Sequence, residues 1–284
     1  GKPQWTFRVK DQIKGAANNS RIVDAAAVPN GDARVPSLFL LDAERKQLTL
    51  CERDATGVWR VVRNLPLPFT EFSALQSVNI GAKQPNSIAF QGINAAAWLA
   101  FDGKVWDIQE LDGYETPIKD GRLMDVVTGD LNNDGRKDLV FLETAKNHID
   151  IVTFEAPHNL KPSDRWQVFE ERTFRSRRSD APEPREALVA DFNGDGSPDV
   201  GAAGAVGYAV FDGKKLMDAN VPSAQTLLWF KTTHDCSSAS TGSSVFDFNG
   251  DGKAEVVYSD EYHLWMYDGQ RDRKSTRLNS SHVK

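Results

Sequence analysis

Short apolar runs recur along the chain and alternate with segments rich in Gly, Asp, Asn and Pro. One stretch contains four such runs in succession: Met124–Thr128, Leu139–Glu143, His148–Phe154 and Trp166–Glu170. Runs of this length with no helical period are typical of β-strands. The other stretches fit the same scheme. Their third run ends in an Asp-Gly pair, at Asp102, Asp212 and Asp268, and such a pair favours a hairpin.

A nine-residue motif occurs three times between these runs. It is Asp-Phe-Asn-Gly-Asp-Gly-Ser-Pro-Asp at Asp191–Asp199, and related copies span Asp130–Asp138 and Asp247–Glu255. Each copy has side-chain oxygens at positions 1, 3, 5 and 9, and a glycine at position 6 that favours a sharp turn. Calcium takes about 6 to 8 oxygen ligands, which alternate residues of a tight loop can supply.

The motif therefore predicts up to three calcium sites, each with four side-chain ligands and the backbone carbonyl of position 7. The predicted ligands are Asp130, Asn132, Asp134, Arg136 and Asp138; Asp191, Asn193, Asp195, Ser197 and Asp199; and Asp247, Asn249, Asp251, Lys253 and Glu255.

Two alternatives compete with this interpretation. An EF-hand requires helices on both sides of the loop and a Glu at position 12, where this chain has Phe141, Ala202 and Tyr258. That alternative therefore fails. A turn rich in Asp, Asn and Gly can also join two strands without a metal. Three copies that keep their acids favour the metal over the bare turn.

The spacing of the motif indicates a repeat protein. Asp130, Asp191 and Asp247 are 61 and 56 residues apart, and segments at Val28 and Asn79 continue the pattern upstream at intervals of 51. These two segments have lost most acids, so we expect no calcium there. Tryptophans at positions 5, 59, 106 and 166 begin strand-like runs late in each unit. Four strands per unit predict an all-β propeller of antiparallel blades, with about five units present.

The three loops and the strands that follow them resemble FG-GAP/VCBS-type repeats, which build the β-propeller of integrin α-chain heads. The resemblance extends over residues 1–271. It implies a calcium-stiffened propeller, commonly of seven blades, that serves cell adhesion or ligand display. The run Asp272–His282 instead resembles a translated sequencing adapter, so we expect residues 272–284 to be disordered and outside the fold. Because the chain begins at Gly1 without Met, we expect both ends to be truncated.

Composition narrows the possible partners. The formal net charge is −6, and residues 272–284 contribute +3, so residues 1–271 carry −9. This excess of acid suits calcium and argues against nucleic acid. We interpret the basic run Arg172–Arg178 as a solvated loop. Cys51 and Cys236 lie on distant units and do not indicate a disulfide framework. No apolar run reaches the roughly 18 residues of a membrane span.

The sequence contains no His-Glu-x-x-His, Gly-x-Ser-x-Gly or phosphate-loop motif, and His234-Asp-Cys236 is expected to be structural. We therefore expect a non-catalytic, calcium-binding scaffold, extracellular or periplasmic, that recognises a protein or glycan ligand. The alternative is the propeller domain of a secreted carbohydrate-active enzyme, a lyase or hydrolase. Its active site would lie on the axial face or in a missing domain.

Overall fold

The computed structural model describes residues 17–29, 35–67, 72–78, 87–100, 112–143, 148–156, 159–162, 186–204, 207–218, 220–232, 242–259, 263–268 and 271–277, with single positions 6, 8, 9, 12, 13 and 106. These residues form five four-stranded antiparallel sheets. In every sheet the hydrogen-bonded neighbours are consecutive in the chain, so each sheet is a simple meander.

The strands occur four to a sheet. The first three sheets comprise β1 (Ile22–Val28), β2 (Ser37–Asp42), β3 (Gln47–Arg53) and β4 (Trp59–Pro66); β5 (Phe72–Val78), β6 (Ser87–Gly92), β7 (Ala95–Ala100) and β8 (Asp112–Glu115); and β9 (Leu123–Gly129), β10 (Asp138–Glu143), β11 (His148–Ala156) and β12 (Asn159–Pro162). The last two comprise β13 (Glu186–Ala190), β14 (Asp199–Gly204), β15 (Gly207–Phe211) and β16 (Leu227–Thr232); and β17 (Gly242–Phe246), β18 (Glu255–Ser259), β19 (His263–Asp268) and β20 (Arg271–Arg277).

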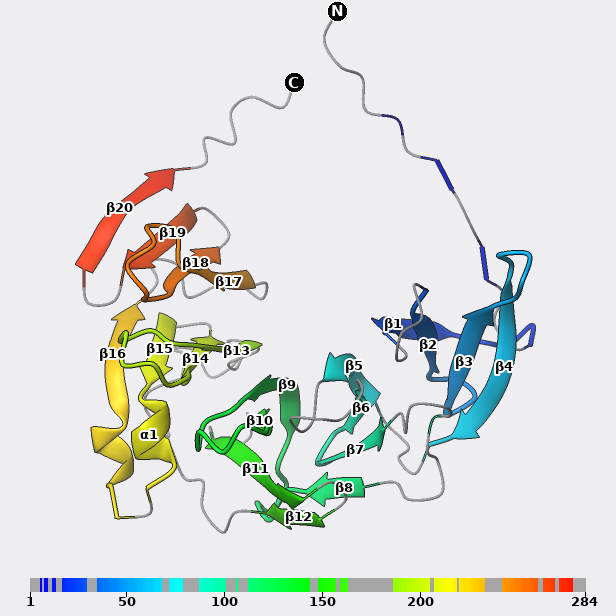
Figure 1. Cartoon of the computed structure of the whole chain (residues 1–284), viewed down its shortest axis with the longest axis horizontal. Coiled ribbons are helices and arrows are strands. Elements are labelled where there is room, and N and C mark those ends of the chain that lie inside the picture. The colour runs from blue at the N-terminus through cyan, green and yellow to red at the C-terminus, as the bar shows by residue number, and fades with distance from the viewer. Residues whose placement is uncertain are drawn as a thin grey trace, which may run out of the picture.

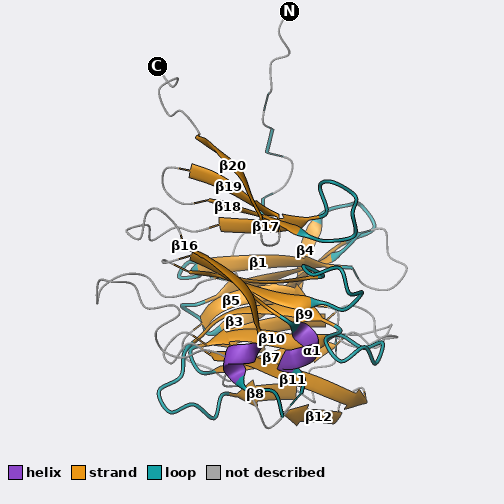
Figure 2. Cartoon of the chain, turned by 90° about the vertical axis from the view of Figure 1, so that its left-hand side faces the viewer, coloured by secondary structure: helices purple, strands orange, loops and turns teal. Residues whose placement is uncertain are grey.

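The sheets follow one another around a common centre, with the first strand of each innermost and the fourth outermost (Figure 1). Within the described residues, helical turns occur only between β15 and β16, as α1 (Gly213–Leu216) and the 3-10 turn η1 (Ser223–Gln225) (Figure 2). This is the arrangement of blades in a β-propeller. The predicted all-β fold of four-stranded antiparallel blades is confirmed.

The core is divided among the junctions between successive sheets. Alternation along the strands gives each sheet two apolar faces, because neighbouring side chains point to opposite sides. Between the third and fourth sheets, for example, Val140 and Ile151 pack in one cluster with Val200 and Phe211, and all four are buried. Aromatic side chains dominate the next junction, where each ring contacts two others in a closed cycle of Tyr208, Trp229, Tyr267 and Tyr258.

Carboxylates on the inner strands join one sheet to the next. Asp125 of β9 accepts hydrogen bonds from the N–H of its neighbour Val126 (2.9 Å) and from Ala187 N–H on β13 (2.8 Å). Asp24 of β1 likewise accepts from Leu75 N–H on β5 (2.8 Å), and Glu186 of β13 accepts from Ser243 N–H on β17 (2.6 Å). We call these three carboxylates, Asp24, Asp125 and Glu186, the inner clasps.

A buried polar group adds a second link between the second and third sheets. The Tyr114 hydroxyl on β8 donates to Asp150 Oδ2 on β11 (2.7 Å), and its ring stacks on Phe141 of β10. Burial raises the pKa of both Tyr114 and Asp150. Each charged form is therefore disfavoured, and the hydroxyl–carboxyl hydrogen bond satisfies two buried polar groups.

Three details differ from the sequence-based expectations. The pair Asp212-Gly213 does not form a hairpin, because Asp212 caps α1 by accepting the N–H of Lys215 (3.2 Å). The fourth strand of the third sheet is β12 at Asn159–Pro162, whereas the predicted strand Trp166–Glu170 lies outside the described residues. Residues up to Arg277, expected to be disordered, form β20 against β19, because a sheet edge can pair with backbone of almost any sequence.

Replacement of an inner clasp should destabilise the fold. We expect Asp125→Ala to lower the free energy of unfolding by about 1 to 3 kcal/mol, because the buried N–H of Ala187 loses its acceptor. Asp125→Asn should recover part of this loss, since one amide oxygen can still accept. Urea denaturation measures the effect. Glu44→Ala is the control, because it also removes one negative charge but at an exposed position. Its free energy of unfolding should stay within about 0.5 kcal/mol of the parent value.

A second prediction compares two equivalent phenylalanines. Phe192 is buried against Trp229 between the fourth and fifth sheets, whereas Phe248 holds the same place in the fifth sheet and is 51% exposed. Phe192→Ala should cost about 3 to 5 kcal/mol of unfolding free energy, because it leaves a core cavity. Phe248→Ala should cost less than about 1 kcal/mol. Similar losses for the two variants in urea denaturation would contradict this account of the core.

Candidate metal centres

The loop between the first and second strands has the same length in all five sheets. The residues that pair across it are Val28 with Ser37, Val78 with Ser87, Gly129 with Asp138, Ala190 with Asp199, and Phe246 with Glu255. Eight residues therefore separate the paired ends in every sheet. The segments predicted near Val28, Asn79, Asp130, Asp191 and Asp247 are these loops. The prediction for the first was wrong by one residue, because Val28 still belongs to β1.

The three acidic loops fold alike. In the third, Asp247 accepts the N–H groups of Asp251 (3.2 Å) and Gly252 (2.9 Å), and Asp251 accepts that of Lys253 (2.9 Å). Equivalent hydrogen bonds, from positions 5 and 6 to position 1 and from position 7 to position 5, occur in the other two loops. The sixth-position glycines, Gly135, Gly196 and Gly252, have φ values of 82°, 81° and 83°, which a side chain would strain.

The ninth-position acids are buried beneath the loops. Asp138, Asp199 and Glu255 are at most 2% exposed, and each accepts the N–H of position 2. Burial raises the pKa of Asp138 to about 7 and that of Asp199 to about 6. The nearby charges of Asp134 and Asp130 raise the Asp138 value further. One oxygen of Asp138, Oδ1, is buried without a hydrogen-bond partner.

Among the described residues, only the third loop brings three carboxylates together. One oxygen each from Asp247, Asp251 and Glu255 lies within 4.8 Å of the other two. In the first loop the position-5 acid instead pairs with the loop's own arginine, Arg136 Nη2 to Asp134 Oδ2 at 2.6 Å. In the second loop Lys214 Nζ lies 2.9 Å from Asp195 Oδ2.

The third-position asparagines also point towards the acids. Asn132 donates to Asp134 (3.3 Å) and Asn193 to Asp199 (3.4 Å), while Asn249 donates to Glu255. The side chains at positions 1, 3, 5 and 9 of each loop are carboxylates or amides, so each can offer an oxygen as a metal ligand. This is the donor set preferred by hard divalent cations such as calcium. The partnerless Oδ1 of Asp138 is the kind of buried acceptor that a cation would satisfy, so the residues present fit calcium.

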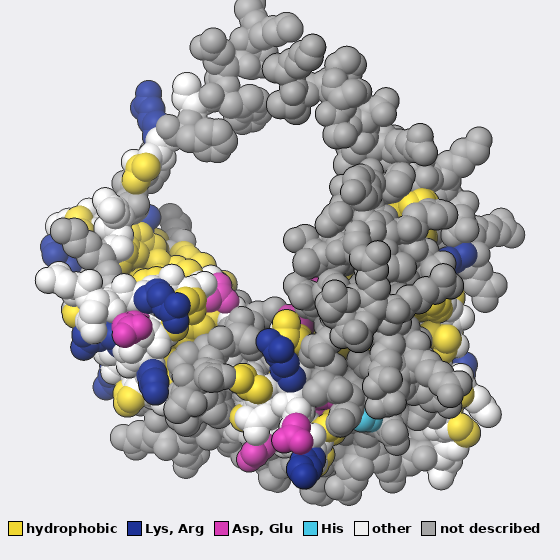
Figure 3. All heavy atoms as spheres, turned by 180° about the vertical axis from the view of Figure 1, so that it is seen from behind, with side chains coloured by type: hydrophobic (Ala, Val, Ile, Leu, Met, Phe, Trp, Pro, Cys, Tyr) yellow, Lys and Arg dark blue, Asp and Glu magenta, His cyan; other side chains and the backbone are white. Residues whose placement is uncertain are grey.

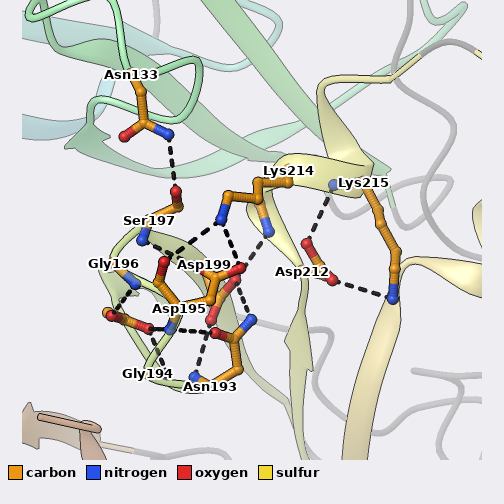
Figure 4. A network of polar contacts seen from close by, with 12 residues as sticks. Asn133, Asn193, Gly194, Asp195, Gly196, Ser197, Asp199, Asp212, Lys214 and Lys215 are labelled. Atoms are coloured by element: carbon orange, nitrogen blue, oxygen red, sulfur yellow. Dashed lines mark hydrogen bonds and ion pairs between the residues drawn. The ribbon is translucent and has the colours of Figure 1, made fainter.

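The three loops touch one another across the sheet junctions. Asn133 Nδ2 of the first loop donates to Ser197 Oγ of the second (2.7 Å), as Figure 4 shows. Ala254 N–H of the third loop donates to the carbonyl of Asp191 (2.8 Å). The side chain of Lys253 packs over Gly194, where an added Cβ would lie 2.8 Å from its carbons. The loops thus form one continuous acidic row.

The remaining candidates carry no site in the described residues. His234, Cys236 and the run Arg172–Arg178 lie outside them, and Cys51 is a buried free thiol. Viewed from behind, the coloured acidic, basic and apolar side chains are interspersed (Figure 3). No helix in the described part of the chain has the length and apolarity required to cross a membrane.

Sequence reasoning missed the inner clasps and Lys214. For the clasps a signal existed. Asp24, Asp125 and Glu186 each stand five residues before their loop, once the first loop is taken to start at Pro29. For Lys214 there was none, because the Asp-Gly pair that precedes it favours a hairpin rather than a helix cap.

Comparison with known proteins gives matches among solved structures alone. No family model matches the chain, and no curated protein is similar in sequence. Among solved structures, an Agrocybe aegerita lectin, described as recognising non-reducing terminal N-acetylglucosamine, is 13% identical with a TM-score of 0.47, over 89% of this chain and 61% of that one.

Two further structures have similar scores. BBS1N in complex with ARL6DN is 10% identical with a TM-score of 0.45, over 86% of this chain and 78% of that one. The WD40 domain of fission yeast SCAP is 12% identical with a TM-score of 0.38, over 94% and 68%. Scores this low do not bear on what the chain binds. The chain spans about three fifths of the lectin's length.

The buried acids predict an unusual pH dependence. The carboxyls of Asp138 and Asp199 each have a pKa in the folded chain above the value of about 4 expected in the unfolded chain. The folded state therefore binds protons more tightly than the unfolded state. Without calcium, the free energy of unfolding should therefore fall as pH rises from about 4 to 7 and then level off. Thermal unfolding in chelator across this range tests the prediction.

Asp138→Asn provides the control, because its neutral side chain does not titrate. Its melting temperature should fall less between pH 5 and 7 than that of the parent chain. Calcium should stabilise the parent more at pH 7.5 than at pH 5, since only the ionised carboxyls bind metal. Equal pH slopes for the parent and Asp138→Asn would contradict the assignment.

Proposed function

We propose that this chain is a calcium-binding β-propeller that serves as a recognition scaffold for a protein or glycan ligand outside the cytoplasm. The observation that carries the proposal is the third loop, where Asp247, Asp251 and Glu255 direct oxygens to within 4.8 Å of one another. The same nine-residue pattern, on the same connection of the third and fourth sheets, supports calcium at all three positions. The resemblance to FG-GAP/VCBS-type repeats belongs to this proposal.

The role of calcium follows from charge. Each acidic loop places one half-buried and one exposed carboxylate above a buried third one, and like charges in one loop repel. A divalent cation would offset most of this negative charge and fix the loop against both strands. Asn132, Asn193 and Asn249 would add neutral oxygens, and the carbonyls of Arg136, Ser197 and Lys253 would complete the shells. Calcium would thereby stabilise the sheet junctions on which the loops lie.

The proposed location outside the cytoplasm rests on the calcium affinity expected of such sites. Calcium sites of extracellular modules typically bind in the range of about 10⁻⁴ to 10⁻³ M, far above the calcium level inside cells. Loops that depend on such binding work where calcium is abundant. Recognition rather than catalysis is the function that an acidic, loop-bearing scaffold serves directly, because residues of its loops can change at constant length without disturbing the sheets.

Calcium titration of the full chain tests the metal sites. Isothermal calorimetry should give up to three sites, and the melting temperature should rise with calcium. Asp251→Ala should remove one site and leave the others, because it deletes a carboxylate from the third loop. Glu44→Ala, which removes an exposed acid outside the loops, should bind like the parent. No heat of binding and no thermal shift would refute the calcium sites.

Ligand screening tests the scaffold role. Glycan and protein arrays probed with calcium and with chelator should show binding that depends on calcium. Turnover of an arrayed glycan by the chain alone would favour the enzyme alternative instead. Expression of the gene with fractionation tests the location, and a cytoplasmic product would count against it.

A further inference from the structure

Among the described residues, a helix between the third and fourth strands occurs only in the fourth sheet. There α1 follows β15 directly, and its N-cap Asp212 also forms an ion pair with Lys215 (3.0 Å). The helix lies against the second acidic loop. Gly213 is so close that an added Cβ would lie 1.9 Å from the carbonyl oxygen of Pro198. Glycine at this position therefore permits the contact.

Two residues of α1 bind acids of that loop (Figure 4). Gly213 N–H donates to Asp199 Oδ1 (3.0 Å), the oxygen whose counterpart in the first loop, Asp138 Oδ1, has no partner. Lys214 Nζ contacts Asp195 at both Oδ2 (2.9 Å) and the backbone carbonyl (3.4 Å). The hydrogen bond from Lys214 is also the main reason that the pKa of Asp195 is lowered.

The third loop provides the contrast. Its sheet has a direct connection from β19, which ends at Asp268, to β20, which begins at Arg271, so no helix lies between them. Its position-5 acid, Asp251, belongs to the group of three converging carboxylates. The second loop has a lysine against its position-5 acid and no such group among the described residues. Two otherwise equivalent loops thus differ at position 5: a lysine side chain is paired with Asp195 in the second loop, whereas Asp251 of the third loop faces other carboxylates.

We propose that Lys214 is an internal counter-ion of the second loop, which stabilises that loop without metal and must withdraw before calcium binds there. This inference rests on the proposed calcium function. Lys214 would weaken the site of the second loop relative to that of the third loop, whose three acids converge, so the third would fill before the second. The protein would then respond to calcium in steps, and the step at the second loop would release Lys214 from Asp195.

The withdrawal is feasible because the ion pair lies at the surface. The side chains of Lys214 and Asp195 are 51% and 35% exposed, so water can solvate both when they separate. Exposed pairs of this kind change an equilibrium by up to about fivefold. The effect on calcium affinity should therefore be of that size rather than an abolition of binding.

Calcium titration of Lys214→Met, in the full chain, tests the inference. We expect one calcium site, that of the second loop, to tighten about three- to fivefold, because its competitor is gone. Lys215→Met is the matched control, since this lysine lies on the same helix but pairs with Asp212. It should leave all affinities unchanged. In the background of Asp191→Asn, which disables the second loop, Lys214→Met should have no effect on the remaining sites.

Thermal unfolding gives a second test, because Lys214→Met should change the melting temperature differently with chelator and with calcium. In chelator, Lys214→Met should melt below the parent, because the second loop has lost its counter-ion. At saturating calcium the difference should shrink or reverse. If the parent binds calcium and Lys214→Met changes neither affinity nor melting, the inference fails while the proposed function stands. If the parent binds no calcium at all, both fail.

Discussion

Packing of one sheet's apolar face on the next is the interaction on which the rest of this structure depends. A single four-stranded meander has two apolar faces and cannot bury both alone. Val140 and Ile151 are buried only because Val200 and Phe211 of the next sheet cover them. The inner clasps fix how neighbouring sheets align, since Asp125 binds backbone on both sides of a junction. The acidic loops inherit their spacing from this alignment.

The loops show how electrostatics is managed on such a scaffold. Carboxylates in these loops are costly without a positive partner or a hydrogen-bond donor, because burial and mutual repulsion disfavour the charged forms. The chain applies different remedies in the three loops. Arg136 pairs with Asp134 within its own loop, and α1 reaches across to Asp195 and Asp199. Around Asp247, Asp251 and Glu255 the acids converge instead, and the proposed calcium would be their counter-ion.

Much of the fold could be predicted from the sequence, because period and alternation are local signals. The recurrence of the Asp130 loop at Asp191 and Asp247 gave the units, and apolar runs gave the strands. What could not be predicted depends on contacts between distant segments. Asp212 caps a helix because that helix packs on Pro198, and nothing in the Asp-Gly pair distinguishes this from a hairpin. Residues Arg271–Arg277 join a sheet through backbone pairing with β19. Their polar side chains show no strand pattern, so the sequence does not predict this pairing.

The constant loop length has a consequence for how this chain can vary. Surface loops usually accept insertions, because extra residues bulge into solvent at little cost. Here the loop also sets which residue of the second strand faces which neighbour. One added residue taken into the strand would exchange the faces of Leu139 and Val140, which are both buried, and each side chain would then enter the packing of the wrong junction. Ser37 and Ser87, which replace the buried acids in the first two loops, illustrate the outcome: residues have changed while the length has not.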